Sequence, residues 1–109
     1  MFNLKEFLAM SEDEQITWLA GEGIVKLHGE VGRMLPVESF ADLAFRLRDE
    51  AKKKDNYAWL RACYTLIKGK LDSYARVMDG KEAEYEVLKK GPKFWIAAAL
   101  QAKEQSDGN

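Results

Sequence analysis

The sequence has few of the residues that build covalently linked or metal-held folds. Its 109 residues include one cysteine, Cys63, and one histidine, His28. A single thiol excludes a disulfide within the chain and any zinc cluster that needs several cysteines. Two prolines and eight glycines are also too few for a collagen-like or linker-like sequence.

Long apolar runs are missing as well. The longest covers residues 94–100, whereas a transmembrane helix needs about 18 apolar residues or more. The first residues carry glutamate at position 6 and acids at positions 12–14, and they lack the apolar segment of a signal peptide. We therefore expect no membrane association and, with one unpaired thiol, a reducing cytoplasm as the compartment.

Charged residues are abundant but balanced. Seventeen Lys and Arg stand against eighteen Asp and Glu, which leaves a net charge of −1. The field of the whole molecule therefore attracts no particular polyelectrolyte. Apolar residues make up 47% of the chain and charged residues 32%, so we expect one packed core with a solvated surface.

Apolar residues recur every three or four positions along almost the whole chain, which is the helical period. Asn3 and Ser11 are each followed three residues later by glutamate, the pattern of a capping box at a helix start. Pro92 suits the first position of a last helix, because its missing N–H would be unpaired there. No segment alternates as a strand does, so the sequence predicts an all-α fold.

After Ser11 one apolar face continues over residues 16–35 with helical spacing. Pro36 ends this segment, because proline disfavours helical geometry in the residue before it. Gly21 and Gly23 each cost roughly 1 kcal/mol inside a helix. We therefore expect a kink or a break near Glu22.

Two longer amphipathic segments, residues 37–54 and 57–78, predict an antiparallel helical hairpin. Asp79 and Gly80 supply a stop after the second helix. A shorter amphipathic helix is expected at residues 81–90.

The predicted fold is thus a single compact helical bundle of about five or six helices, centred on that antiparallel hairpin. Residues 1–104 form one domain, because neither a linker nor an internal repeat divides them. Residues 105–109 are polar and are expected to form a disordered tail.

Groups that could perform chemistry are sparse. His28 could accept a phosphoryl group on a helical bundle, but histidine phosphotransfer domains place a lysine three positions later, where this chain has Val31. The paired acids of all-helical pyrophosphohydrolases are incomplete, since Arg33 follows Glu30 at the position of the second acid. Cys63 lies on an apolar stripe, as buried thiols do. We predict no enzyme, with no catalytic residue, cofactor or metal site.

Basic residues concentrate in the middle of the chain. Residues 46–76 hold nine Lys and Arg against four acids. On the helix predicted over residues 57–78, a basic stripe opposite the apolar face contains Arg61, Lys68 and Arg76. Such a stripe can neutralise the phosphates of a nucleic acid, or it can be an ordinary solvated face. Both interpretations stay open.

Trp18 is a candidate binding residue because it lies slightly off the centre of its apolar face, so we expect it to be only partly covered. Tryptophan is enriched in binding hot spots, although it also anchors cores. Gly29 and Gly32 would let a neighbouring backbone approach closely, either within the domain or in a homodimer.

The segment 91–104 reads GPKFWIAAALQAKE. It resembles the closing stretch of small uncharacterised helical bacteriophage and prophage proteins, which often finish with proline, an aromatic pair, an apolar residue, alanines and Lys-Glu. Residues 46–51 (RLRDEA) and 57–60 (YAWL) are similar in style. The resemblance carries no activity. It implies a viral gene product that acts on host machinery by occupying a partner's surface.

These patterns together predict a non-enzymatic protein–protein interaction module. We expect a small regulator or inhibitor that covers the surface of an unidentified protein partner, alone or as a homodimer. The alternative is a nucleic-acid binding protein that uses the basic stripe on the phosphate backbone.

Overall fold

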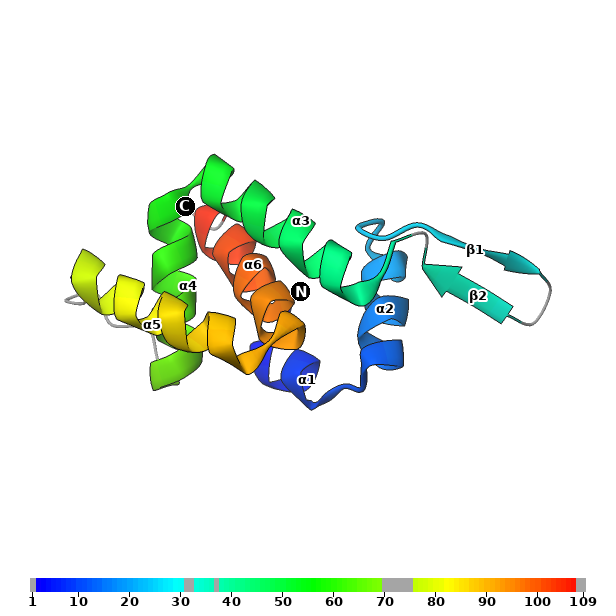
Figure 1. Cartoon of the computed structure of the whole chain (residues 1–109), viewed down its shortest axis with the longest axis horizontal. Coiled ribbons are helices and arrows are strands. Elements are labelled where there is room, and N and C mark those ends of the chain that lie inside the picture. The colour runs from blue at the N-terminus through cyan, green and yellow to red at the C-terminus, as the bar shows by residue number, and fades with distance from the viewer. Residues whose placement is uncertain (1, 31–32, 37, 70–75, 108–109) are drawn as a thin grey trace.

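The structure, a computed structural model, describes residues 2–30, 33–36, 38–69 and 76–107. Within these ranges the chain forms six helices and one two-stranded hairpin (Figure 1). The elements are α1 (Leu4–Ala9), α2 (Glu12–Gly21), β1 (Leu27–Glu30), β2 (Arg33–Pro36), α3 (Phe40–Lys54), α4 (Asn56–Lys68), α5 (Val77–Lys90) and α6 (Pro92–Asp107). The predicted all-α class and the number of helices are confirmed.

Helix α6 is the centre of the bundle. It contacts α1, α3, α4 and α5, which surround it in Figure 1. Its residues 96–100 are all buried, so this helix has no solvent-facing side over that turn. The prediction placed an antiparallel hairpin of α3 and α4 at the centre. The structure places α6 there instead, because α3 packs mainly on α6 and α4 packs on α5 and α6.

The predicted helix starts are confirmed. Ser11 Oγ accepts a hydrogen bond from the Glu14 N–H (3.2 Å), and the Glu14 carboxylate accepts one from the Ser11 N–H (3.1 Å). The Asn3 side chain accepts from the Glu6 N–H (3.1 Å) at the start of α1. Pro92 is the first residue of α6. These caps depend on residues three positions apart, which is why the sequence alone predicts them.

The predicted break near Glu22 is confirmed, since α2 ends at Gly21 and Gly23 has a φ of +75°. The prediction that the helical face continues as far as Leu35 is wrong. Strands β1 and β2 pair there as an antiparallel hairpin. The segment 21–32 holds four glycines, and this loss of helix propensity outweighs the helical spacing of its apolar residues.

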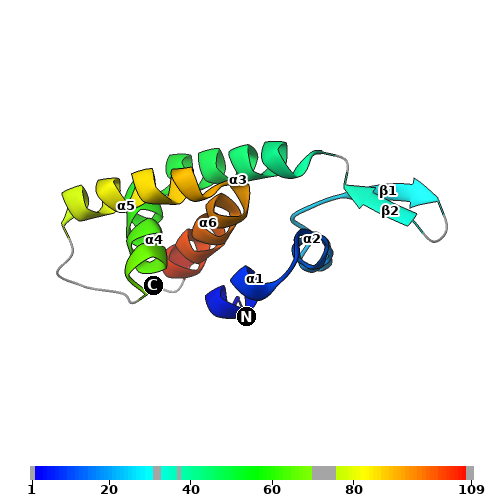
Figure 2. The ribbon, with the colours of Figure 1, turned by 60° about the horizontal axis from the view of Figure 1, so that its bottom comes forward.

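The hairpin projects from the helices in both ribbon views (Figures 1 and 2). It lengthens the molecule, whose principal dimensions are 50 × 27 × 26 Å. The core itself lies among the helices, and Trp59, Phe7, Leu19 and Leu43 are its largest fully buried apolar side chains.

The single helix predicted over residues 57–78 is also wrong. Helix α4 ends at Lys68, and Gly69 adopts the left-handed conformation with a φ of +77°. Helix α5 then begins at Val77. Residues 70–75, which the prediction included in the helix, lie outside the described residues. A glycine in this conformation ends a helix even where the apolar spacing continues.

The predicted stop at Asp79 and Gly80 lies inside α5. The Asp79 carboxylate accepts a hydrogen bond from the Arg76 N–H (2.8 Å), so this acid begins a helix rather than following one. Gly80 is buried where α5 crosses α4. A Cβ at this position would lie 2.8 Å from the Leu60 Cβ and 3.2 Å from the Leu60 carbonyl oxygen. Glycine therefore allows the two helices to approach this closely.

The prediction of a disordered tail from residue 105 is wrong for its first part. Helix α6 continues to Asp107, and Gln105 Nε2 donates to Thr65 Oγ1 on α4 (3.4 Å). A helix that is already formed and docked extends without a new nucleation step, and each added residue gains a hydrogen bond, so polar residues can continue it. Residues 108–109 lie outside the described residues.

Replacing Gly80 by alanine is expected to lower the free energy of unfolding by about 1–2 kcal/mol. The added methyl group would overlap the Leu60 Cβ and backbone, which cannot rotate away, and this outweighs the gain in helix propensity. Urea unfolding followed by far-UV circular dichroism measures the change.

Gly21→Ala is the matched control, because it is also a helical glycine but nothing lies within 4 Å of its added Cβ. Its unfolding free energy should stay equal or rise by up to about 1 kcal/mol. A Gly80→Ala protein that is as stable as Gly21→Ala would contradict the close packing of α5 on α4.

Candidate functional site

The three basic residues of the predicted stripe do not lie on one helix. Arg61 and Lys68 belong to α4, whereas Arg76 precedes the first residue of α5. The prediction of a basic stripe along one helix is therefore wrong. The structure still brings two of them together, since Arg61 and Arg76 line the same small hollow between α4 and α5. Lys68 lines a larger groove beside it, and Tyr64 borders both.

Large apolar side chains are exposed on the same surface. The described residues contain five exposed large hydrophobic side chains, and four of them line the small hollow or the groove. Their exposed fractions are 52% for Tyr57, 47% for Val77, 61% for Met78 and 62% for Tyr85. We call this surface the α4–α5 face. It consists of Tyr57, Arg61, Tyr64, Ile67, Lys68, Arg76, Val77, Met78, Asp79, Lys81, Glu82, Tyr85 and Glu86.

The groove of the α4–α5 face carries nearly balanced charge. Its cations are Lys68 and Lys81. Three carboxylates stand against them, on Asp79, Glu82 and Glu86. The acids in the groove weaken its attraction for the phosphates of a nucleic acid, while its apolar walls can still pack against a protein.

The small hollow is more basic, but its cations are engaged within the molecule. The Arg61 guanidinium lies over the Tyr57 ring, 5.6 Å from its centroid. Arg76 Nε lies 3.8 Å from the Asp79 carboxylate. Both arginines are at least partly exposed, so an anionic group in solvent can contact them.

Trp18 lies in the aromatic cluster of the N-terminal helices. Its ring centroid is 5.8 Å from that of Phe2 and 5.6 Å from that of Phe7. The side chain is half-buried, which confirms the expected partial cover. These ring contacts hold α1 and the residue before it against α2. Trp18 therefore contributes to the core rather than to the α4–α5 face.

His28 lies in strand β1, opposite Leu35 of β2. The hypothesis of a phosphoacceptor required a histidine on a helix, and this placement contradicts it. Gly29 also lies in β1, whereas Gly32 lies outside the described residues. Among the residues that the structure describes, no three His, Cys, Asp or Glu side chains gather as metal ligands.

Within the described ranges, no helix is both long enough and apolar enough to cross a lipid bilayer.

Cys63 is fully buried on α4, as its place on the apolar stripe predicts. Burial raises the pKa of the thiol far above its ordinary value, and the nearby Glu84 carboxylate raises it further. A thiol in this state is protonated at neutral pH and is a poor nucleophile.

Glu84 is a polar residue whose role sequence analysis missed. Its carboxylate accepts a hydrogen bond from the indole N–H of the fully buried Trp59, and Lys52 Nζ lies 3.3 Å from it. The acid thus connects α5 with α4 and α3. Its partners lie 25 and 32 positions earlier in the chain, so no local spacing could reveal them.

Arg46 is a second such residue. Its Nε and Nη2 donate to the Glu38 carboxylate at 3.0 and 2.7 Å, and Nη1 donates to Glu50 at 3.2 Å. Nη2 also donates to the Ile24 carbonyl oxygen (3.0 Å), which ties the segment after α2 to α3. Helical spacing predicts the Glu50 pair but neither of the other two partners.

Raising the pH above about 8.5 is expected to lower the free energy of unfolding through Cys63. The thiol ionises in the unfolded chain at this pH but stays protonated in the fold, because its folded-state pKa is raised. Its contribution to stability is complete below the unfolded pKa and is lost above it, at about 1.4 kcal/mol per pH unit.

Urea unfolding of the wild type and of Cys63→Ala from about pH 7 to about pH 10 measures this term. Subtracting the pH dependence of the variant removes the contributions of lysines and tyrosines. Equal slopes in the two proteins would show that the thiol is not held protonated.

Known proteins provide no further assignment. No family model matches the chain, and neither a curated protein nor a solved structure matches it. The resemblance of residues 91–104 to phage proteins therefore stays a prediction. The function must be argued from the surfaces of the molecule itself.

Proposed function

We propose that this protein is a non-enzymatic interaction module that binds another protein through the α4–α5 face. The observation that carries the proposal is the exposure of Tyr57, Val77, Met78 and Tyr85 on one surface. Large apolar side chains gathered at the surface are typical of protein-binding sites. Tyrosine is enriched in the few residues that dominate binding energy.

The shape of the groove favours an amphipathic helix as the bound segment. Tyr64 and Ile67 are half-buried and form apolar walls from α4, while Met78 and Tyr85 are exposed and stand on α5. Met78 and Tyr85 are seven residues apart, which places them two turns along one side of α5. A groove between two helices receives the apolar face of a third helix by the packing that holds helical bundles together.

The mode of action that follows is steric. The protein has a packed body before binding, so a partner segment in the groove would be covered without refolding of this chain. Together with the phage-like segment 91–104, this supports a small regulator or inhibitor of a host protein in the cytoplasm. A second copy of the chain is the other protein that the same face could bind, which would give a homodimer.

Binding to a nucleic-acid backbone remains the second hypothesis. Arg61 and Arg76 in the small hollow, with Tyr57 beside them, favour it because they could contact a phosphate and a base. The carboxylates Asp79, Glu82 and Glu86 oppose it across the rest of the face. Protein binding therefore has the better support.

Replacing Met78 and Tyr85 together by glutamate is expected to abolish partner binding, because both side chains are exposed and the new charges would be buried in the complex. Tagged wild-type protein should retain a protein from a host lysate up to about 0.5 M salt, since an apolar interface depends little on ionic strength. The double variant should lose that protein. If the partner is a second copy of the chain, size-exclusion chromatography with light scattering should show a dimer for the purified wild type and a monomer for the double variant.

Ala9→Glu combined with Ala41→Glu is the matched control. Both alanines are exposed, and neither lines the α4–α5 face, so this variant adds the same charge elsewhere. It should retain the partner as the wild type does. Equal binding by all three proteins, or no specific partner and no self-association of the wild type, would overturn the proposal.

Charge reversal at Lys68 and Arg76 separates the two hypotheses. A backbone binder should lose nucleic-acid affinity on Lys68→Glu with Arg76→Glu, and its salt dependence should become shallower by about one logarithmic unit per lost phosphate contact. A protein interface should keep most of its affinity. Fluorescence anisotropy with labelled single- and double-stranded oligonucleotides, over a salt series, makes this measurement. Tight, steeply salt-dependent binding that the reversal abolishes would favour the second hypothesis.

A further inference from the structure

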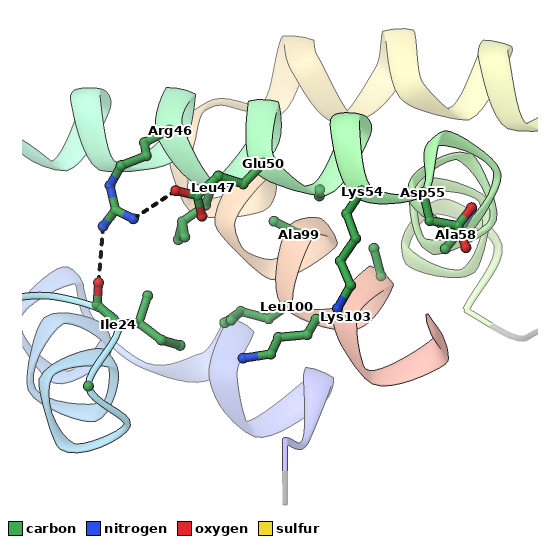
Figure 3. Close-up of a pocket in the computed structure, with 13 residues that line it drawn as sticks. Ile24, Arg46, Leu47, Glu50, Lys54, Asp55, Ala58, Ala99, Leu100 and Lys103 are labelled. Carbon is green, nitrogen blue, oxygen red and sulfur yellow. Dashed lines mark hydrogen bonds and ion pairs between the residues drawn. The ribbon is translucent and has the colours of Figure 1, made fainter. Parts of the chain in front are cut away.

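A separate cavity lies on another part of the bundle (Figure 3). It opens between α3, the start of α4, α6 and the segment Gly23–Ile24, and its volume is about 330 Å³. It shares no lining residue with the α4–α5 face. Pockets that bind small molecules begin at about 300 Å³, so this space could hold a small ligand.

The inner surface of the cavity is apolar. Ala58, Ala99 and Ala102 are buried there and leave the space that larger side chains would fill. The apolar lining also includes Leu47, Leu100, Ile24 and Ala51. Such a surface favours the hydrocarbon part of a ligand. A bound ligand fills the cavity and removes apolar area of both the protein and the ligand from water.

The mouth of the cavity is charged, and most of these charges already have partners. Arg46 is held by Glu38 and Glu50. Asp55 accepts a hydrogen bond from the Ala58 N–H (3.0 Å) as the cap of α4. These groups form fixed walls, because each is engaged within the fold.

Two lysines at the mouth give the cavity its positive character. Figure 3 shows Lys54 extending from α3 toward α6 and Lys103 lying beside Leu100. Within the described part of the chain, the Lys103 ammonium makes neither an ion pair nor a hydrogen bond. The lining as a whole has three cations, on Arg46, Lys54 and Lys103. It has two carboxylates, on Glu50 and Asp55.

We propose that this cavity binds a small amphipathic carboxylate, with its apolar chain on the alanine surface and its carboxylate at Lys103. An ammonium group gives a carboxylate a charge-assisted hydrogen bond, and it gives none to a cation. At roughly 30 Å³ per water-sized group, the cavity holds a ligand of about ten heavy atoms. Octanoate has this size and chemistry.

Titration of the full-length protein with octanoate, followed by ¹H–¹⁵N correlation spectra, tests the proposal. We expect a Kd on the order of 0.1–1 mM, with shifts centred on Ala58, Ala99 and Ala102. The neutral alcohol 1-octanol should bind about tenfold more weakly, because it lacks the charged group. Octyltrimethylammonium should not bind there. Octanol binding as tightly as octanoate, or absence of shifts at these amides, would overturn the proposal.

Variants at the cavity identify the two parts of the site. Lys103→Gln should weaken octanoate binding about tenfold and leave octanol binding unchanged, because only the carboxylate loses its partner. Lys93→Gln, also on α6 but outside the cavity, is the matched control and should bind both ligands as the wild type does. Equal effects of the two lysine variants would contradict a carboxylate site at Lys103.

Ala51→Leu should block both ligands by filling the cavity, since Ala51 lines it from α3 and is only half-buried. Circular dichroism shows whether this variant is folded. If it is not folded, the two lysine variants still decide the outcome. Undiminished octanoate binding by folded Ala51→Leu would place the ligand elsewhere and refute the site.

Discussion

The structure depends on a helix that is enclosed by other helices. Helix α6 contacts α1, α3, α4 and α5, and its residues 96–100 have no solvent-facing side. A helix in this position can be approached closely from several directions only if its side chains are small, and three of these five residues are alanine. The same choice leaves unfilled space where the neighbours do not meet. The cavity beside Ala99 and Ala102 therefore results from the packing rule that builds the core.

A second close approach determines the outer surface. Gly80 lets α5 lie directly on Leu60 of α4, and Glu84 fixes the contact by accepting the hydrogen bond of Trp59. With that side of α5 buried, other side chains of the helix stay exposed, and Met78 and Tyr85 are among them. The apolar surface that we propose as the binding site therefore follows from the way α5 is anchored.

The two candidate sites differ in how their charges are used. On the α4–α5 face, bases and acids nearly cancel, so apolar contacts would dominate binding and charge would set orientation. At the cavity, Arg46 and Asp55 are engaged in the fold, which leaves Lys103 to determine which ligands are admitted. The first arrangement suits a protein segment and the second suits a small anion. The two sites share no residue, so each can be lost without the other.

The sequence by itself determined what depends on neighbours within one helical turn. The helical class, the caps at Asn3 and Ser11, the start of α6 at Pro92 and the burial of Cys63 all follow from spacings of three or four residues. Even there, apolar spacing misled where glycines were frequent, and a strand hairpin stands where a helix was expected. Only the tertiary structure decided that α6 is central, that α5 crosses α4 at Gly80 and that a cavity opens beside α6. These features join residues that are distant in the chain, and the free energy that selects them comes from packing that no local pattern records.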